Sequence, residues 1–241
     1  MKGKMQGVTL VADWAPKPGF KLGSKDIEGR QTYLGSQVWR NPRLEIREYP
    51  IPTPGPEEVL MQVKACGICG SDVHMAQADK EGYIYYPGLT GFPSILGHEF
   101  SGVVVEAGKN ARDKRTNKPF KGGEAVTTEE MLWCGQCKPC ADGQPNHCEQ
   151  LDEVGFNVNG AYTTYIVLPS RTLWSLNRCA RTTKVMISSS PAAWWSRPQW
   201  HITRSSNAAV VSTPVTGPLS WEAGRWVSPP VPSSSAPVPR R

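Results

Sequence analysis

Three segments of the chain are predicted to form strands, and in one of them hydrophobic positions alternate with other residues. The first has its apolar positions at Val59, Met61, Val63 and Ala65, the period of a strand with one buried face. Further strands are predicted at residues 100–106 and 161–168, where Gly108 and Pro169 follow. Residues 109–121 are polar and charged and predict a surface loop. The pattern therefore predicts a mainly β (α+β) fold.

The pattern breaks near residue 177. Residues 1–176 are expected to form one folded domain. Residues 177–241 hold nine of the 22 prolines, twelve serines and five of the nine tryptophans, and no helical or strand period persists there. Disorder is one interpretation of this Pro/Ser/Trp-rich tail, although disordered tails seldom carry so many tryptophans.

Charge separates the same two parts. The net charge is +6, and the tail carries eight basic residues and one acid, which gives +7 and leaves −1 for residues 1–176. A near-neutral main body argues against a nucleic-acid partner. No apolar run reaches the length of about 20 residues that a membrane-spanning helix needs, and no signal-peptide core follows Met1. We therefore expect a cytoplasmic protein whose seven cysteines serve metal ligation or catalysis rather than disulfides.

Four cysteines are closely spaced as Cys134-x2-Cys137-x2-Cys140-x7-Cys148. Thiolates are soft ligands that suit zinc, and four of them complete a closed tetrahedral site with no open position for a substrate. The spacing therefore predicts a structural zinc ion. An iron–sulfur cluster and four unrelated buried thiols are the alternatives.

A second constellation consists of Cys69, Ser71, His74, His98 and Glu99. A thiolate and an imidazole with one further ligand are typical of an open catalytic metal site, so Cys69 and His98 are the expected ligand pair. Ser71 and His74 are the expected proton relay from a metal-bound alcohol. Glu99 belongs to the candidate metal site, with a supporting contact to the ligand histidine as its expected role.

Other interpretations exist for residues near this constellation. Cys66 and Cys69 have the spacing of a redox pair, but metal ligation by Cys69 explains the motif better and leaves Cys66 as a small buried thiol. Tyr83, Tyr85 and Tyr86 lie between the two parts of the constellation. They either shape a substrate pocket or simply pack a loop.

These motifs together resemble the zinc-dependent medium-chain dehydrogenases, the alcohol, sorbitol and threonine dehydrogenase group. The resemblance covers residues 40–176 and rests on Gly67-Ile68-Cys69-Gly70-Ser71-Asp72, Gly97-His98-Glu99-Phe100-Ser101-Gly102 and the cysteine quartet. It implies a GroES-like β-barrel catalytic domain with a structural-zinc lobe and a catalytic zinc at Cys69 and His98. Runs such as residues 65–76, 86–93 and 130–134 are similar to the inositol-catabolic branch, the scyllo-inosose dehydrogenases, which implies a cyclic polyol or its ketone as substrate.

The resemblance also implies NAD(P) as hydride acceptor and assembly into homo-oligomers. The family's Rossmann domain and its G-x-G-x-x-G fingerprint are absent from this chain. We therefore expect a truncated dehydrogenase with little or no turnover of its own. The alternative is a non-enzymatic zinc-binding module whose basic tail contacts nucleic acid.

A frameshift near Asn177 would explain the tail. One permitted coding of residues 220–227, read from its third base, gives Leu-Gly-Gly-Gly-Pro-Val-Gly, which contains the missing fingerprint. The same shift on residues 195–198 permits the Glu-Pro pair that sorbitol-type relatives use as a zinc ligand, and on residues 186–193 it permits a plausible lead-in. Three such segments in one frame favour an out-of-frame tail.

Overall fold

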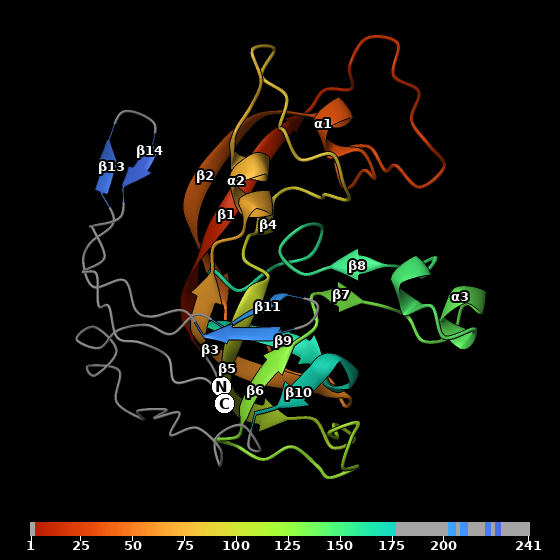
Figure 1. The fold of residues 1–241 in the computed structure, drawn as a ribbon, viewed down its shortest axis with the longest axis vertical. Helices are drawn as coiled ribbons and strands as arrows, with labels where there is room; N and C mark the ends of the chain where they lie inside the picture. Colours follow the sequence, from red (N-terminus) through yellow and green to blue (C-terminus); the bar gives the residue numbers. More distant parts are fainter. Residues whose placement is uncertain (1–2, 177–201, 206–207, 212–219, 223–224, 228–241) are drawn as a thin grey trace, which may run out of the picture. The chain divides into compact units, whose positions relative to one another are not determined.

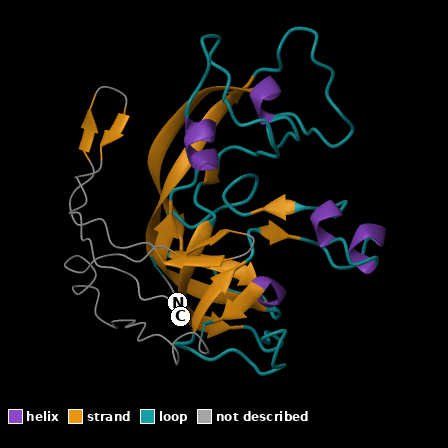
Figure 2. Ribbon diagram, in the orientation of Figure 1, coloured by secondary structure: helices purple, strands orange, loops and turns teal. Residues whose placement is uncertain are grey.

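The computed structural model describes residues 3–176 and four short stretches, residues 202–205, 208–211, 220–222 and 225–227 (Figure 1). The chain divides into two compact units, Met1–Val185 and Met186–Arg241. The predicted domain boundary after residue 176 lies within the first of these units, and it stays a prediction. Figure 2 shows that strands and loops make up most of the described chain and that its helices are short, which confirms the mainly β fold.

A long antiparallel hairpin, which is not among the predicted strands, opens the first unit. β1 (Lys4–Trp14) pairs with β2 (Trp39–Pro50), and β4 (Ser94–Ile95) pairs with the other edge of β1. The register between β1 and β2 shifts between Val11 and Asp13. Alternation is obscured in β1 because the neighbours Thr9 and Leu10 are both fully buried.

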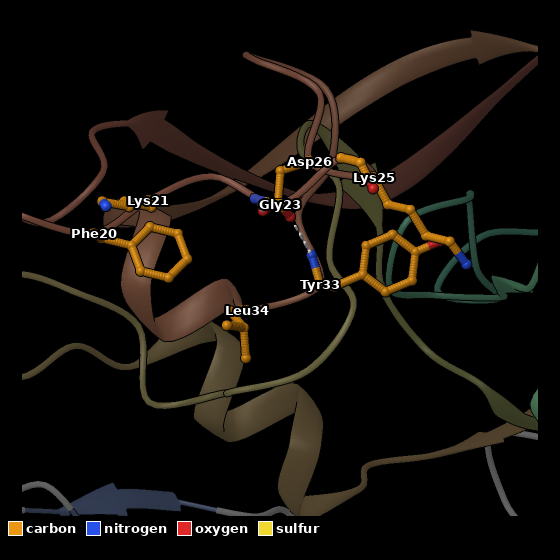
Figure 3. A pocket seen from close by; sticks show the side chains of 8 residues that line it. Phe20, Lys21, Gly23, Lys25, Asp26, Tyr33 and Leu34 are labelled. Atoms are coloured by element: carbon orange, nitrogen blue, oxygen red, sulfur yellow. Dashed lines mark hydrogen bonds between the residues drawn. The ribbon is translucent and has the colours of Figure 1, made fainter.

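The loop of residues 15–34 connects β1 to α1 (Gly35–Val38) and carries a surface pocket of about 300 Å³ (Figure 3). The carboxylate of Asp26 organises this loop by accepting hydrogen bonds from the backbone N–H of Gly23 at 2.6 Å and of Tyr33 at 2.9 Å. The lining residues are Phe20, Lys21, Gly23, Ser24, Lys25, Asp26, Tyr33 and Leu34. None of the predicted site residues lines this pocket.

A five-stranded antiparallel sheet forms the centre of the first unit, in the order β10-β6-β5-β3-β9. Its strands are β3 (Glu58–Gly67), β5 (Glu99–Ala107), β6 (Ala125–Thr128), β9 (Tyr165–Pro169) and β10 (Leu173–Ser175). The three predicted strands correspond to β3, β5 and β9, although β9 begins four residues later than residue 161. The short helix η2 (Ser170–Thr172) joins β9 to β10.

Burial along β3 is more extensive than one alternating face. Val59, Leu60 and Met61 are all fully buried, and the register with β5 shifts between Leu60 and Met61. A bulge of this kind re-aims the following side chains and bends the strand. The prediction of a single buried face therefore holds only for part of β3.

Two hydrophobic clusters make up the core of the first unit. One lies on the central sheet and consists of Val59, Met61, Phe100, Val104, Ala111, Phe120, Val126, Val154, Ala161, Ile166, Leu168 and Leu173. The other joins the N-terminal hairpin to α2 (Gly70–Ala76) and consists of Leu10, Trp39, Met75, Ile84, Phe92, Leu96 and Phe156. The predicted loop at residues 109–121 contains no helix or strand, but it contributes Ala111 and Phe120 to the first cluster.

A separate small substructure follows β6. β7 (Met131–Leu132) pairs with β8 (Asp152–Glu153), and the chain between them forms α3 (Lys138–Ala141) and η1 (Pro145–His147). All four cysteines of the quartet lie between β7 and β8. We call residues 131–153 the cysteine lobe.

The second unit contains two short hairpins among its described residues. β11 (Ile202–Ser205) pairs with β12 (Ala208–Val211), and β13 (Ser220–Glu222) pairs with β14 (Arg225–Val227). The expectation that no strand pattern persists in the tail is wrong for these stretches, because β-branched residues such as Val210 and Val211 favour strands even in short runs. The proposed frameshift point at Asn177 lies outside the described residues. Within the described part of the chain, no helix has the length and apolarity to cross a membrane.

Candidate metal centres

The cysteine lobe brings its four sulfur atoms together. The Sγ atoms of Cys134, Cys137, Cys140 and Cys148 all lie within 4.8 Å of one another. Cys134 lies two residues after β7, Cys137 caps the N-terminus of α3, and Cys140 lies within that helix. Cys148 is buried and follows η1. Two turns of chain thus wrap the sulfurs around one point, as the spacing predicts for a metal site.

Backbone N–H groups point at these sulfurs. Cys134 Sγ accepts hydrogen bonds from the N–H of Cys137 at 3.3 Å and of Gln136 at 3.5 Å. Cys148 Sγ accepts them from the N–H of Cys134 and of Gln150, both at 3.3 Å. Donors of this kind favour the thiolate form, which is the form that binds a metal.

The pKa values of two thiols in the quartet are shifted in opposite directions. Hydrogen bonds from the N–H of Gln136 and Cys137 lower the pKa of the Cys134 thiol to about 6. Desolvation and the neighbouring sulfurs raise the pKa of Cys140 to about 12. Four thiolates at this separation repel one another, so a bound divalent cation is what allows all of them to ionise. The donor set therefore fits a zinc ion.

The start of the cysteine lobe is fastened to the central sheet. Arg171, in η2, donates from Nη2 at 2.9 Å and from Nε at 3.1 Å to the carbonyl oxygen of Trp133, the residue before the first ligand. The carboxylate of Glu129 accepts hydrogen bonds from the indoles of Trp133 at 3.2 Å and Trp174 at 2.9 Å, and from Lys114 at 2.8 Å. These contacts hold the lobe at the point where it leaves the sheet.

The second candidate centre forms where β3, α2 and β5 meet. Cys69 caps the N-terminus of α2, His98 immediately precedes β5, and Glu99 is its first residue. The pairing of Gly67 with Glu99 brings these segments side by side. One ligand atom from each of Cys69, His98 and Glu99 lies within 4.8 Å of the others.

His98 is the most enclosed member of this centre, with 5% of its surface exposed. Its Nε2 lies 3.2 Å from the hydroxyl of Ser71, and its Nδ1 lies 3.6 Å from Oδ1 of Asp72. The ring of Phe156 packs against the imidazole at a centroid distance of 4.6 Å. Nδ1 has no hydrogen-bond partner in the described part of the protein. The imidazole is thus fixed in place by its neighbours.

Opposing effects act on the ionisation of Cys69 and His98. Burial works against the charged form of His98, but the carboxylate of Asp72 and the sulfur of Cys69 outweigh it and raise its pKa to about 9. Burial likewise works against the Cys69 thiolate, but hydrogen bonds from Ser71 and the charge of His98 lower its pKa. A metal cation bound in place of the proton on His98 would keep Cys69 in its thiolate form. Such an exchange of a proton for a metal ion is expected at a metal site.

The proposed relay residues lie three positions apart on α2 and therefore share one face of that helix. The Ser71 hydroxyl contacts His98, as described above. The side chain of His74 is exposed, and its carbonyl oxygen accepts hydrogen bonds from the N–H of Tyr85 and Tyr86 at 3.0 and 3.2 Å. The relay between Ser71 and His74 stays a prediction.

The nearby aromatic residues divide into two groups. Tyr83 is buried beneath Lys17 and Arg40, so it packs the loop, and Tyr85 is half exposed. Tyr86 packs on Phe156 at 5.2 Å, and Phe156 in turn packs on His98. Tyr86 is therefore connected to the second centre through Phe156, and its role in a substrate pocket stays a prediction.

Sequence reasoning missed three residues at this centre. Asp72 lies within the quoted motif but had no assigned role, although its position at N3 of a helix is a capping signal. Tyr162 and Phe156 reach the centre from the segment before β9, and no local pattern marks them. Cys66 packs against the core, and burial raises its pKa to about 12, which argues against a reactive redox thiol.

Comparison with known proteins identifies the family. Residues 55–178 match the alcohol dehydrogenase GroES-like domain. The chain belongs to the zinc-dependent medium-chain dehydrogenases. The predicted GroES-like catalytic domain is thereby confirmed, and zinc is the ion expected in the cysteine lobe.

Several dehydrogenases are similar to this chain. It is 62% identical over 173 residues to scyllo-inosose 3-dehydrogenase of Thermotoga maritima, covering 71% of this chain and 44% of the relative. It is 36% identical over 153 residues to L-threonine 3-dehydrogenase of Xanthomonas oryzae pv. oryzae, covering 63% and 39%. A solved structure from Thermotoga maritima, described as an alcohol dehydrogenase, is 60% identical with a TM-score of 0.72 and covers 74% of this chain and 45% of that one. The chain thus spans less than half of the length of these medium-chain dehydrogenases.

Proposed function

We propose that this chain carries the catalytic zinc domain of a dehydrogenase that removes hydride from a secondary alcohol and transfers it to NAD or NADP. The observation that carries the proposal is the convergence of Cys69, His98 and Glu99 within 4.8 Å beside the Ser71 hydroxyl. This is a set of three mixed ligands, and such a set leaves a position for water or substrate.

A zinc ion bound there would act as a Lewis acid that stabilises the developing alkoxide. Cys69 and His98 would hold it, with Glu99 beside them. Ser71 would accept the substrate's hydroxyl proton while releasing its own hydroxyl proton, and His74, on the exposed end of the same helix face, would take up the released proton and pass it to solvent. Phe156 excludes water from one side of the ligand histidine.

For the substrate, we propose a cyclic polyol or its ketone. The relative from Thermotoga maritima is named as a scyllo-inosose 3-dehydrogenase, and its 62% identity spans the segments that form the second centre. The half-buried ring of Tyr86, which packs on the buried Phe156 beside that centre, offers an aromatic surface that suits the apolar face of a ring compound. A non-enzymatic zinc module would account for the cysteine lobe but would leave the second centre without a role. The six free thiols among the described residues also suit a reducing compartment, so we propose the cytoplasm.

Residues 177–241 are proposed to be translated out of frame. The family match ends at residue 178, close to the point where composition and charge change. Resequencing the gene tests this proposal. A Rossmann coding sequence in the alternate frame is the expected result, and its absence would refute the frameshift.

Metal analysis tests the two zinc sites. We expect the purified 241-residue protein to hold two zinc ions per chain, Cys69→Ser to hold one, and the matched variant Cys140→Ser to lose the other. One ion in the unsubstituted protein would refute the second centre.

Turnover tests the reaction itself. With the alternate frame restored in the gene, we expect oxidation of a cyclic polyol with NAD or NADP, and we expect Cys69→Ser to abolish it. If the restored protein turns over neither polyols nor simple secondary alcohols while holding both ions, the proposed activity is wrong.

A further inference from the structure

Tyr162 occupies an unusual position between the two segments that carry the ligands of the second centre. Its phenolic oxygen lies 3.0 Å from the carbonyl oxygen of Gly67, two residues before Cys69, and 3.0 Å from Oδ2 of Asp72. Its backbone N–H donates to the carbonyl oxygen of Leu96, two residues before His98, at 2.9 Å. One residue thus contacts both segments.

The tyrosine ring also packs on the backbone next to His98. A Cβ atom placed on Gly97 would lie 2.6 Å from Cδ1 of Tyr162, well inside contact distance. Gly97 has a φ of +91°, a conformation that L side chains rarely adopt. The ring therefore lies directly against the turn that presents the ligand histidine.

Asp72 connects Tyr162 to the metal ligands. Its Oδ2 accepts hydrogen bonds from the N–H of Cys69 at 2.9 Å and from Tyr162, while its Oδ1 accepts one from the N–H of Gly97 at 3.3 Å and faces Nδ1 of His98 at 3.6 Å. Asp72 is 4% exposed, so water cannot readily replace a lost donor. Without the phenol, Oδ2 would keep only one donor, and the carboxylate could rotate away from the imidazole.

Burial and the charge of Asp72 raise the pKa of the Tyr162 phenol, so the hydroxyl stays protonated and remains a donor. A phenylalanine would fill the same space and keep the contact with Gly97. It would lose both polar contacts. The hydroxyl is therefore the part of the side chain that links the ring to Asp72.

We propose that Tyr162 is a positioning residue for the second metal centre, acting through Asp72 to hold His98 and Cys69 in their ligating arrangement. This inference rests on the proposed function, because it requires a metal ion at that centre. Residues that orient metal ligands typically change metal affinity by about 10–100-fold when they are lost. The effect should be confined to one of the two metal sites, since no Tyr162 contact reaches the cysteine lobe among the described hydrogen bonds.

The test compares Tyr162→Phe with the unsubstituted protein and with Tyr49→Phe. Tyr49 is a matched control because its hydroxyl also makes a partly buried hydrogen bond, to Thr9 at 2.7 Å, but in the N-terminal hairpin. Each metal-free protein would be titrated with Co2+, whose absorption spectrum separates a four-thiolate site from a site with one thiolate. Zinc affinity would then follow from chelator competition.

For Tyr162→Phe we expect binding at the one-thiolate site to weaken about tenfold or more, with the four-thiolate spectrum unchanged. Tyr49→Phe should leave both sites unchanged. In an Asp72→Asn background, adding Tyr162→Phe should cause no further loss, because the aspartate carries the effect. Equal affinity in Tyr162→Phe and the unsubstituted protein, or fully additive losses with Asp72→Asn, would overturn the inference while leaving the metal site intact. An unsubstituted protein that shows only the four-thiolate spectrum would refute the proposed function and this inference with it.

Discussion

Replacing Gly97 with alanine probes how tightly the second centre is built. Two separate costs are expected. At a φ of +91°, a side chain introduces strain of about 1–2 kcal/mol. The new methyl group would also lie 2.6 Å from the Tyr162 ring and 2.9 Å from Sγ of Cys66, and overpacking of this kind costs about 1–3 kcal/mol.

The expected loss for Gly97→Ala is therefore about 2–5 kcal/mol in the free energy of unfolding. Gly123→Ala is the matched control. Gly123 has a φ of +85°, but a Cβ placed there would meet no atom within 4 Å. This variant should lose only the strain, about 1–2 kcal/mol.

Urea unfolding of the zinc-saturated variants would measure both losses, provided that the slopes of the transitions agree. Zinc content after dialysis would show whether Gly97→Ala also weakens the second centre, because the shifted Tyr162 ring pushes on the segment that carries His98. Equal destabilisation in the two variants would refute the reasoning, since it would mean that the neighbours of Gly97 move aside without cost.

Two further predictions concern the attachment of the cysteine lobe. Burial works against the Glu129 carboxylate, but Lys114 and the two indoles lower the pKa of this group below its ordinary value of 4.5. The ionised carboxylate therefore contributes stability that is present above that pH and is lost as the pH falls through the lowered pKa. Acid unfolding monitored by circular dichroism should therefore show a flatter pH dependence below about pH 4.5 in Glu129→Gln; an unchanged profile would contradict this. Arg171→Lys keeps the charge but cannot place two donors on the Trp133 carbonyl. It should speed zinc release from the four-thiolate site to a chelator by several-fold, whereas Arg112→Lys, on the exposed loop, should not.

The cysteine lobe shows what local sequence can reveal. Its ligands are close in sequence, and turn residues such as Gly135 and Gly143, with φ values of +79° and +80°, lie between them. A chain of this kind can wrap one ion with few long-range contacts, so spacing alone predicts the site. The pairing of the short strands β7 and β8 only holds the two ends of the lobe together.

The second centre depends on pairings that local sequence does not specify. Cys69 and His98 meet only because β3 and β5 pair in the register that sets Gly67 opposite Glu99. The motif resemblance predicts Cys69 and His98 as ligands, but it assigns no role to Asp72 and gives no indication of Tyr162. The contact between Tyr162 and Asp72 arises because β9 pairs with the other edge of β3, which brings the residues before β9 over the turn at Gly97. The N-terminal hairpin was missed for a related reason, since a bulge and buried neighbours hide its alternation.

This difference in construction has a consequence for how the two metal sites respond to damage elsewhere in the fold. The quartet is closed by one lobe, so disturbing the central sheet should speed zinc release from the lobe but leave the lobe able to bind zinc. The second centre needs β3, β5 and the segment before β9 at once. Its buried aspartate receives donors from Cys69, which follows β3, from Gly97, which precedes β5, and from Tyr162, which precedes β9. The zinc proposed at Cys69 and His98 should therefore depend on the assembled sheet, and its occupancy should report whether that sheet has folded, whereas the zinc proposed in the lobe should not.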